Sequence, residues 1–136
     1  MTRIISLVNQ KGGVGKTTTS INIAASLGKM KKQTLLIDLD PQGNASTGLG
    51  INKGNLKYSA YDVLTGRCNI KEAILKTKFS HLCILPANIN LAGIDMELMQ
   101  MEYNDVEFKK NEQLKKAIES LEGVFDYIII DCPPSL

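Results

Sequence analysis

The sequence of 136 residues has little cysteine, little net charge and no long apolar run. Its three cysteines, Cys68, Cys83 and Cys132, are odd in number and lack metal-site spacing, so we expect reduced thiols in a cytosolic chain. A net charge of +2 is too small to indicate nucleic acid or an anionic membrane as a partner. No signal-peptide segment opens the chain, and nothing approaches the ~20 apolar residues of a membrane-spanning helix, so we expect a soluble protein.

A run rich in glycine and lysine lies between a predicted strand at 3–9 and a predicted helix at about 17–31. Backbone N–H groups at a helix start have no helical partners, and the helix dipole adds positive charge there. Glycines let the backbone curl around phosphate oxygens because they have no Cβ. The pattern predicts a site for a nucleoside triphosphate with Mg²⁺, formed by Lys11, Gly12, Gly13, Val14, Gly15, Lys16, Thr17 and Thr18.

Two lysines distinguish this loop from the general phosphate-loop pattern G-x-x-x-x-G-K-[ST]. Gln10 replaces the first glycine of that pattern, and a second lysine, Lys11, stands at the head of the loop. We expect Lys16 to contact the β- and γ-phosphates and the Thr17 hydroxyl to bind Mg²⁺. Lys11 would instead reach a phosphate held by a second subunit, where charge supplied in trans is worth roughly 10³–10⁵ in rate. The alternative for Lys11 is a solvated surface lysine.

Strands and helices alternate along the chain, which predicts a parallel sheet covered by helices. Apolar runs predict further strands at 34–38, 82–85 and 127–131, and helical spacing predicts helices near 59–65, 70–76 and 107–122, with a stripe through Leu91, Ile94, Leu98 and Met101. Residues 41–57 are predicted to be loop with a short turn or two. The methionines Met96, Met99 and Met101 are predicted to pack in the core, a partner surface being the alternative. The predicted fold class is therefore α/β: a three-layer, Rossmann-like P-loop NTPase with a mostly parallel sheet.

Two of the predicted strands end in aspartate. Carboxylates at the carboxyl edge of a parallel sheet face the crevice where ligands of α/β folds bind. Asp131 follows three isoleucines and fits a role in holding Mg²⁺. Asp38 and Asp40 point the same way if the strand continues, and we expect Asp38 to help hold the water shell of the metal. Asp40 is better placed to orient an attacking water, the alternative being a turn residue before Pro41.

The chain stops directly after the strand at 127–131, whereas a doubly wound sheet usually continues. No segment is evidently placed to recognise a nucleotide base. We therefore expect residues 1–136 to be the N-terminal portion of a single P-loop ATPase domain, truncated before its C-terminal strands. Such a truncation would leave the first strand as an exposed apolar sheet edge, which is an association hazard.

Three motifs together resemble the ParA/Soj family of chromosome- and plasmid-partitioning ATPases. They are Lys11-Gly12-Gly13-Val14-Gly15-Lys16-Thr17-Thr18, Asp38-Leu39-Asp40-Pro41-Gln42-Gly43-Asn44 and Asp131-Cys132-Pro133-Pro134-Ser135-Leu136, with further likeness at 85–88 and 91–93. The glycine-rich loop is shared with a wider group that includes MinD, arsenite-pump ATPases and the nitrogenase iron protein. The resemblance covers the whole chain but only the first half of a typical family member.

The resemblance implies an ATPase that forms an ATP-dependent homodimer with two Mg·ATP at its interface. It implies a cytoplasmic protein, associated with the nucleoid when ATP-bound, that binds DNA without sequence preference through the half absent here. It also implies a ParB-type partner that stimulates hydrolysis, and no membrane. Residue by residue, it implies catalytic roles for Lys11, Lys16 and Asp40, Mg²⁺ ligands at Thr17, Asp38 and Asp131, a switch I at about 38–48 and a switch II beginning at about 131.

Three other functions stay open at this point. A MinD-type, membrane-recruited division-site ATPase would need a C-terminal amphipathic helix. An electron-transfer or iron–sulfur carrier ATPase would need cysteines that ligate a cluster between subunits, and Cys132 is in the wrong register directly after Asp131. A nucleotide-binding fragment without turnover is the third.

Overall fold

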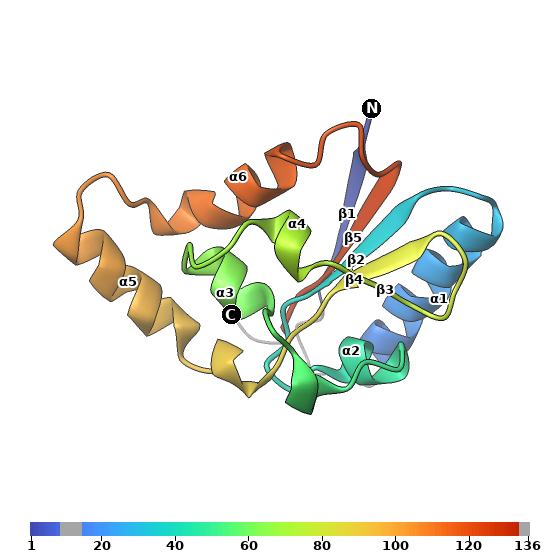
Figure 1. The fold of residues 1–136 in the computed structure, drawn as a ribbon, viewed down its shortest axis with the longest axis horizontal. Helices are drawn as coiled ribbons and strands as arrows, with labels where there is room; N and C mark the ends of the chain where they lie inside the picture. The colour runs from blue at the N-terminus through green and yellow to red at the C-terminus, as the bar shows by residue number, and fades with distance from the viewer. Residues whose placement is uncertain (9–14, 134–136) are drawn as a thin grey trace.

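The structure, a computed structural model, describes residues 1–8 and 15–133 (Figure 1). No helix in these ranges has the length and apolar character needed to cross a membrane. The elements follow in the order β1 (Arg3–Leu7), α1 (Gly15–Lys29), β2 (Thr34–Asp38), α2 (Asn44–Gly48), η1 (Lys53–Asn55), α3 (Ala60–Leu64), α4 (Ile70–Ala73), β3 (Leu75–Lys76), β4 (Leu82–Leu85), η2 (Ile89–Leu91), α5 (Ile94–Asn104), η3 (Lys110–Glu112), α6 (Gln113–Glu119) and β5 (Tyr127–Asp131).

The described strands form a sheet of five in the order β1-β5-β2-β4-β3. β1, β5, β2 and β4 run parallel, and β3 pairs antiparallel with β4. The carboxyl ends of β1, β5 and β2 therefore meet at one edge of the sheet. α1 and α2 cover one face, while α3, α4 and α6 lie over the other, which gives the three predicted layers (Figure 1).

Alternation along the central strands divides the core into two parts. In β2, Leu35 and Ile37 join the cluster under α3, α4 and α6, whereas Leu36 joins the cluster under α1 and α2. In β5, Ile128 and Ile129 divide in the same way. Successive side chains of a strand point to opposite faces, so a strand buried on both faces is apolar throughout. This explains the consecutive apolar residues inside β2 and β5, at 35–37 and 128–130.

The strands predicted at 34–38, 82–85 and 127–131 are confirmed, and the first strand ends at Leu7 rather than at residue 9. The predicted helix at 70–76 is wrong in its second half. Ile74 is extended, with φ −72° and ψ 134°, and the next two residues pair with β4 as β3. Tertiary pairing thus overrides the local pattern there. In the predicted loop at 41–57, the short turns expected are the one-turn helix α2 and the 3₁₀ turn η1.

Two predicted helices are shorter than their apolar spacing indicates. In the segment 107–122, only Gln113–Glu119 is α-helical, as α6, and it follows directly on the 3₁₀ helix η3. The stripe from Leu91 to Met101 is divided into η2 and α5 by Gly93, whose φ of 77° is left-handed. A left-handed residue cannot continue a right-handed helix, so the two pieces are separate.

Several apolar side chains lie at the surface. Met96 and Met99 on α5 are 77% and 57% exposed, so the prediction that they pack in the core is wrong for both. On β1, the edge strand of the described sheet, Ile4 is 51% exposed and Ile5 36%. The exposed apolar edge expected for the first strand is therefore present among the described residues.

Candidate functional site

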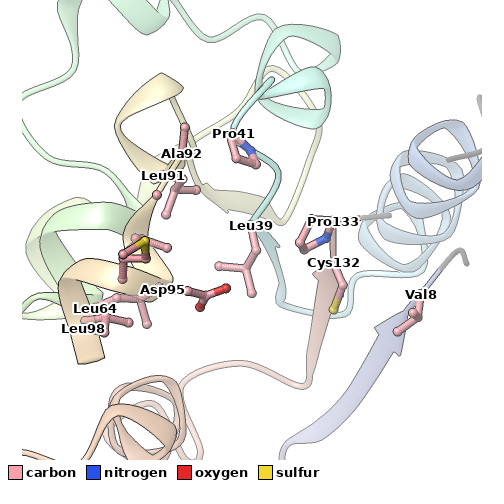
Figure 2. A pocket seen from close by; sticks show the side chains of 13 residues that line it. Val8, Leu39, Pro41, Leu64, Leu91, Ala92, Asp95, Leu98, Cys132 and Pro133 are labelled. Atoms are coloured by element: carbon pink, nitrogen blue, oxygen red, sulfur yellow. The ribbon is translucent and has the colours of Figure 1, made fainter. Parts of the chain in front are cut away.

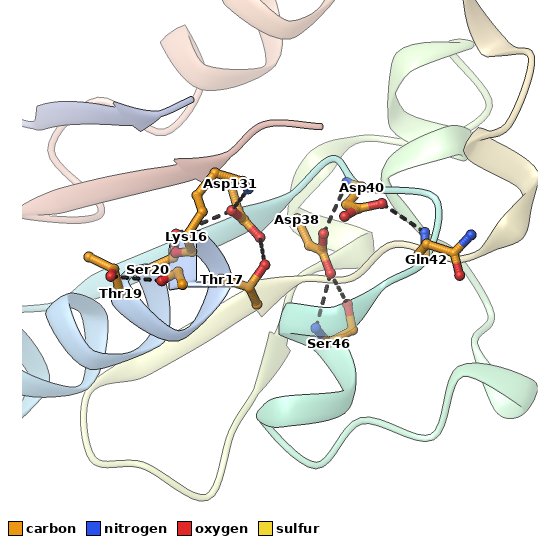
Figure 3. A network of polar contacts seen from close by, with 10 residues as sticks. Lys16, Thr17, Thr19, Ser20, Asp38, Asp40, Gln42, Ser46 and Asp131 are labelled. Atoms are coloured by element: carbon orange, nitrogen blue, oxygen red, sulfur yellow. Dashed lines mark hydrogen bonds and ion pairs between the residues drawn. The ribbon is translucent and has the colours of Figure 1, made fainter. Parts of the chain in front are cut away.

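Two buried carboxylates lie side by side at the carboxyl edge of the sheet. Asp38 ends β2 and Asp131 ends β5, and the two residues are partners in the register of these parallel strands. Neither is exposed. Figure 3 shows both side chains near the first turn of α1. The topology therefore joins two of the predicted site residues that are far apart in the sequence.

Asp131 is held by three side chains from the start of α1 (Figure 3). Its Oδ1 forms an ion pair with the Lys16 ammonium, which is itself almost fully buried. The Thr17 hydroxyl donates to Oδ2 at 3.2 Å, and the Ser20 hydroxyl donates to Oδ1 at 3.2 Å. A buried carboxylate needs such compensation, because an unpaired charge away from water is costly. The structure thus brings together Lys16, Thr17 and Asp131, as the predicted site requires.

Asp38 is held by a different set of donors. Its Oδ2 accepts hydrogen bonds from the backbone N–H and the hydroxyl of Ser46, at 3.0 and 2.7 Å. Its Oδ1 accepts from the backbone N–H of Asp40 at 3.1 Å. Burial raises the pKa of Asp38 to about 6, against the lowering effect of these hydrogen bonds, and the neighbouring Asp131 carboxylate raises the pKa further. Asp38 therefore titrates much closer to neutrality than an ordinary aspartate.

Asp40 begins a turn in the segment after β2. Its Oδ1 accepts from the backbone N–H of Gln42 at 2.9 Å, and its carbonyl accepts from the N–H of Gly43 at 2.8 Å. This is the arrangement of the alternative named above, a turn residue before Pro41. The carboxylate is half-buried, and its second oxygen remains for another donor. A role in orienting water stays a prediction.

Part of the predicted loop lies outside the described residues: Lys11, Gly12, Gly13 and Val14. Gly15, Lys16, Thr17 and Thr18 form the first turn of α1, with Thr18 exposed. Residues 134–136 of the predicted switch II also lie outside, whereas Asp131, Cys132 and Pro133 are described.

Two residues of the site were missed by sequence reasoning. Ser20 lies four positions after Lys16, the spacing that puts side chains on one helix face, so its place beside Asp131 could have been found from periodicity. Ser46 lies in a segment predicted to be loop, and no spacing rule links it to Asp38. Both serines are fully buried, and each donates its hydroxyl hydrogen to one of the two carboxylates.

A cavity of about 1020 Å³ lies between the carboxyl edge of the sheet and the start of α5 (Figure 2). Leu39 and Cys132, the residues after Asp38 and directly after Asp131, line it from the sheet side. Leu91 and Leu98 line it from the other side, and Asp95 is the charged side chain among its described lining residues. The cavity is therefore an apolar space next to the carboxylates.

The donor set fits a magnesium ion bound together with phosphates. Mg²⁺ prefers oxygen ligands, and in nucleotide sites it is held by one or two carboxylates while phosphates and waters supply the rest. Thr17 and Asp131 offer a hydroxyl and a carboxylate within 3.2 Å of each other, with the Asp38 carboxylate beside them. Among the described residues, no three acidic, histidine or cysteine side chains gather as a metal cage. The site suits an ion that arrives with its own oxygen ligands.

A family model described as an AAA domain matches residues 2–136. The sporulation initiation inhibitor protein Soj of Bacillus subtilis is 46% identical over 136 residues, covering 100% of this chain and 51% of that protein. The chromosome partitioning protein ParA of Myxococcus xanthus is 47% identical over 134 residues, covering 98% of this chain and 45% of that protein. The chain thus spans about half the length of the curated relatives it matches.

Solved structures give the same picture of the fold. A cobyrinic acid a,c-diamide synthase from Mycobacterium smegmatis with bound ATP analogue and magnesium is 41% identical with a TM-score of 0.89, covering 99% of this chain and 52% of that one. The septum site-determining protein MinD from Pyrococcus horikoshii, complexed with Mg-ADP, is 35% identical with a TM-score of 0.78, covering 100% and 51%. The predicted P-loop fold is confirmed, and the chain belongs to the AAA domain family, in which it matches the N-terminal half of its ParA and Soj relatives.

Proposed function

We propose that this chain binds Mg·ATP at the carboxyl edge of its sheet and carries the hydrolytic residues of a ParA/Soj-type DNA-partitioning ATPase. The observation that carries the proposal is the meeting of Lys16, Thr17 and Asp131 where α1 begins and β5 ends. The named relatives support it: curated ParA and Soj proteins are 42–47% identical over nearly the whole chain. A MinD-type division-site function is the alternative, since two MinD structures are 34–35% identical.

In this proposal the residues of α1 and β5 exchange partners when nucleotide binds. Lys16 leaves the Asp131 carboxylate and pairs with the β- and γ-phosphates, which carry more negative charge. Thr17 and Asp131 would then hold Mg²⁺ through their side-chain oxygens, and Asp38 would hold the water shell of the ion. When bound, Mg²⁺ neutralises charge that develops on the phosphate oxygens. Asp40 accepts a hydrogen bond from the attacking water and orients it toward the γ-phosphate.

The chain's switch segments follow from this assignment. Switch I covers about 38–48, from Asp38 through α2, and switch II begins at about 131. Both start at the two paired carboxylates, so contacts to nucleotide reach both segments through the ends of β2 and β5. Order and disorder of such segments is a common response to a γ-phosphate.

The wider function is a cycle of dimerisation on Mg·ATP, with Lys11 reaching the nucleotide of the second subunit. A ParB-type partner would stimulate hydrolysis, and DNA would be bound without sequence preference by the half of the relatives that this chain does not match. Lys11→Ala tests the trans contact: it should keep Mg·ATP binding and lose the dimer in light scattering. A variant that dimerises and turns over normally would contradict this role.

The direct test of the proposal is calorimetric titration of Mg·ATP into the chain. We expect binding with Mg²⁺ present and at least tenfold weaker binding with excess EDTA, because the ion bridges protein and phosphates. Lys16→Ala should weaken Mg·ATP binding by a similar factor. Lys29→Ala, an exposed lysine in the last turn of the same helix, is the matched control and should leave binding unchanged. Equal binding by Lys16→Ala and the unmodified chain would contradict the proposed site.

A further inference from the structure

Ser46 joins two segments at the site through one fully buried hydroxyl. Its Oγ donates to Asp38 Oδ2 at 2.7 Å and accepts from the backbone N–H of Ala87 at 3.0 Å. A serine hydroxyl has one donor and can accept at the same time, so both bonds form together. The backbone N–H of Ser46 donates to the same Asp38 oxygen at 3.0 Å. Helix α2 is thereby fixed against the end of β2.

The Asp38 carboxylate, held by Ser46, in turn holds the backbone of Asp40. One oxygen, Oδ2, is occupied by Ser46, and the other, Oδ1, accepts from the backbone N–H of Asp40 at 3.1 Å (Figure 3). A carboxylate is planar, so fixing one oxygen fixes the direction of the other. The orientation that Ser46 imposes on Asp38 therefore sets where the backbone of Asp40 is held.

The second bond of Ser46 anchors the network to the rigid part of the fold. Ala87 is fully buried and follows the central strand β4. The preceding residue, Pro86, accepts from the N–H of Ala60 at the start of α3, at 2.8 Å. The hydroxyl thus ties Asp38 to a segment that is itself held from the opposite layer. Bonds to a charged acceptor are stronger than neutral ones, and a buried N–H without a partner is costly.

We propose that Ser46 is a positioning residue for the hydrolytic step: its hydroxyl orients Asp38 so that Asp40 is held at the place from which it can direct water. This inference rests on the proposed function, since it assigns Asp40 the water. Ser46 itself touches neither nucleotide nor water. Its effect on turnover comes through Asp38 and the backbone of Asp40.

The test compares three variants of the chain that grade the Ser46 hydroxyl with one control. Ser46→Ala removes both hydroxyl bonds, Ser46→Cys keeps a weak donor and acceptor of similar shape, and Ser46→Thr keeps the hydroxyl. The matched control is Thr34→Val. Thr34 is fully buried at the opposite end of β2 from Asp38, and its hydroxyl donates to the Lys32 carbonyl at 2.8 Å, so its loss weakens the fold away from the carboxylates.

The first measurement is hydrogen exchange of single backbone amides by NMR, without nucleotide. In Ser46→Ala, exchange at Asp40 and Ala87 should rise about tenfold or more relative to the central strand β5, as expected for a lost bond to a charged group. Ser46→Thr should restore protection, and Ser46→Cys should be intermediate. Thr34→Val should leave the ratio of exchange at Asp40 to exchange in β5 unchanged. An unchanged Asp40 amide in Ser46→Ala would overturn the proposal, even if that variant is less stable.

The second measurement is ATP turnover at varied Mg·ATP. Ser46→Ala should lower kcat about tenfold or more with KM changed less than threefold, because binding groups remain while the water is misdirected. Equal losses in Ser46→Ala and Thr34→Val would reduce Ser46 to a purely structural residue and overturn the proposal. Failure of the unmodified chain to bind Mg·ATP would instead count against the proposed function. In that case, hydrogen exchange at the backbone N–H of Asp40 still tests whether Ser46 positions Asp38 and Asp40.

Discussion

Asp38 and Asp131 are register partners on neighbouring parallel strands, and both are fully buried, yet they are compensated in different ways. Asp131 pairs with the Lys16 ammonium, whereas Asp38 is held by hydroxyl and amide hydrogens alone. Two adjacent carboxylates disfavour each other's charged form, so the cation at one of them matters for both. The first two predictions follow from this difference.

Removing the Lys16 ammonium should destabilise the fold. Lys16→Ala leaves Asp131 buried without its ion pair, and we expect the free energy of unfolding to fall by about 3 kcal/mol. The loss should lie at the lower end for such pairs because Thr17 and Ser20 still donate. The double variant Lys16→Ala/Asp131→Asn should regain part of it, since the buried charge is gone. Urea unfolding of both variants measures this, and a double variant no more stable than the single one would refute the argument.

The stability of the fold should depend on pH through Asp38. Burial raises the pKa of Asp38 from 3.8 to about 6, so the folded state binds this proton more tightly than the unfolded state. The stabilising contribution is therefore fully present below pH 3.8 and is lost as the pH rises through about 6. Asp38→Asn keeps the shape of the side chain and removes the titration.

Urea unfolding of the unmodified chain and of Asp38→Asn at a series of pH values checks this prediction. The difference in free energy of unfolding, unmodified minus variant, should decrease from about pH 4 to about pH 7 and then level off. Subtracting the free energies of the variant removes the pH dependence that comes from the other titrating groups, because both proteins share those groups. A difference that stays constant over this range would show that Asp38 has an ordinary pKa.

Replacing Asp40 should distinguish a role of its carboxylate in ATP hydrolysis from a role in forming the turn. Asp40→Ala removes both the carboxylate and the acceptor for the Gln42 N–H, whereas Asp40→Asn keeps an acceptor for the turn. If the carboxylate directs water, both variants should lose about 10²-fold or more in ATP turnover while still binding Mg·ATP. Steady-state turnover with calorimetric binding measures the two properties. Normal turnover in Asp40→Asn would leave only the turn as the function of this residue.

Gly28 should not tolerate a side chain. It lies in the last turns of α1, and an added Cβ would stand 2.2 Å from the carbonyl oxygen of Ser80 in the β3–β4 connection. Alanine favours a helix by about 1 kcal/mol over glycine, but relieving this overlap requires a backbone shift. We expect Gly28→Ala to lower the free energy of unfolding by about 1–3 kcal/mol. The exposed Ser26→Ala on the same helix is the control in thermal unfolding, and equal melting temperatures would contradict the contact.

The elements that can be predicted from the sequence are those that local pattern alone determines. β2 and β5 have apolar interiors, at 35–37 and 128–130, because both faces are buried, and each ends at a buried aspartate. β3 could not be predicted, since Leu75 and Lys76 extend only by pairing with Ile84 and Cys83. The position of α2 could not be predicted either, since Ser46 fixes it against Asp38 by a contact across the fold.

The same limit applies to the site. The glycine-rich run and the strand-end aspartates have fixed spacing and were found. The proximity of Asp38 to Asp131 depends on strand order, because β5, last in the described sequence, lies between β1 and β2. The alternation of strands and helices along the sequence does not determine the order of the strands in the sheet. The resemblance to a family suggested the roles of the site residues, whereas the structure shows which side chains lie beside them.

Helix α1 has one end at the carboxylates and the other against the β3–β4 connection. Lys16 and Gly28 are separated by about 18 Å at 1.5 Å per residue, and Gly28 meets Ser80 without room for a single methyl group. A helix of this length behaves as a stiff rod. If phosphate binds beside Lys16 as proposed and tilts α1, the other end of the helix would move against the connection at 77–81, and a fluorophore attached there would report the movement.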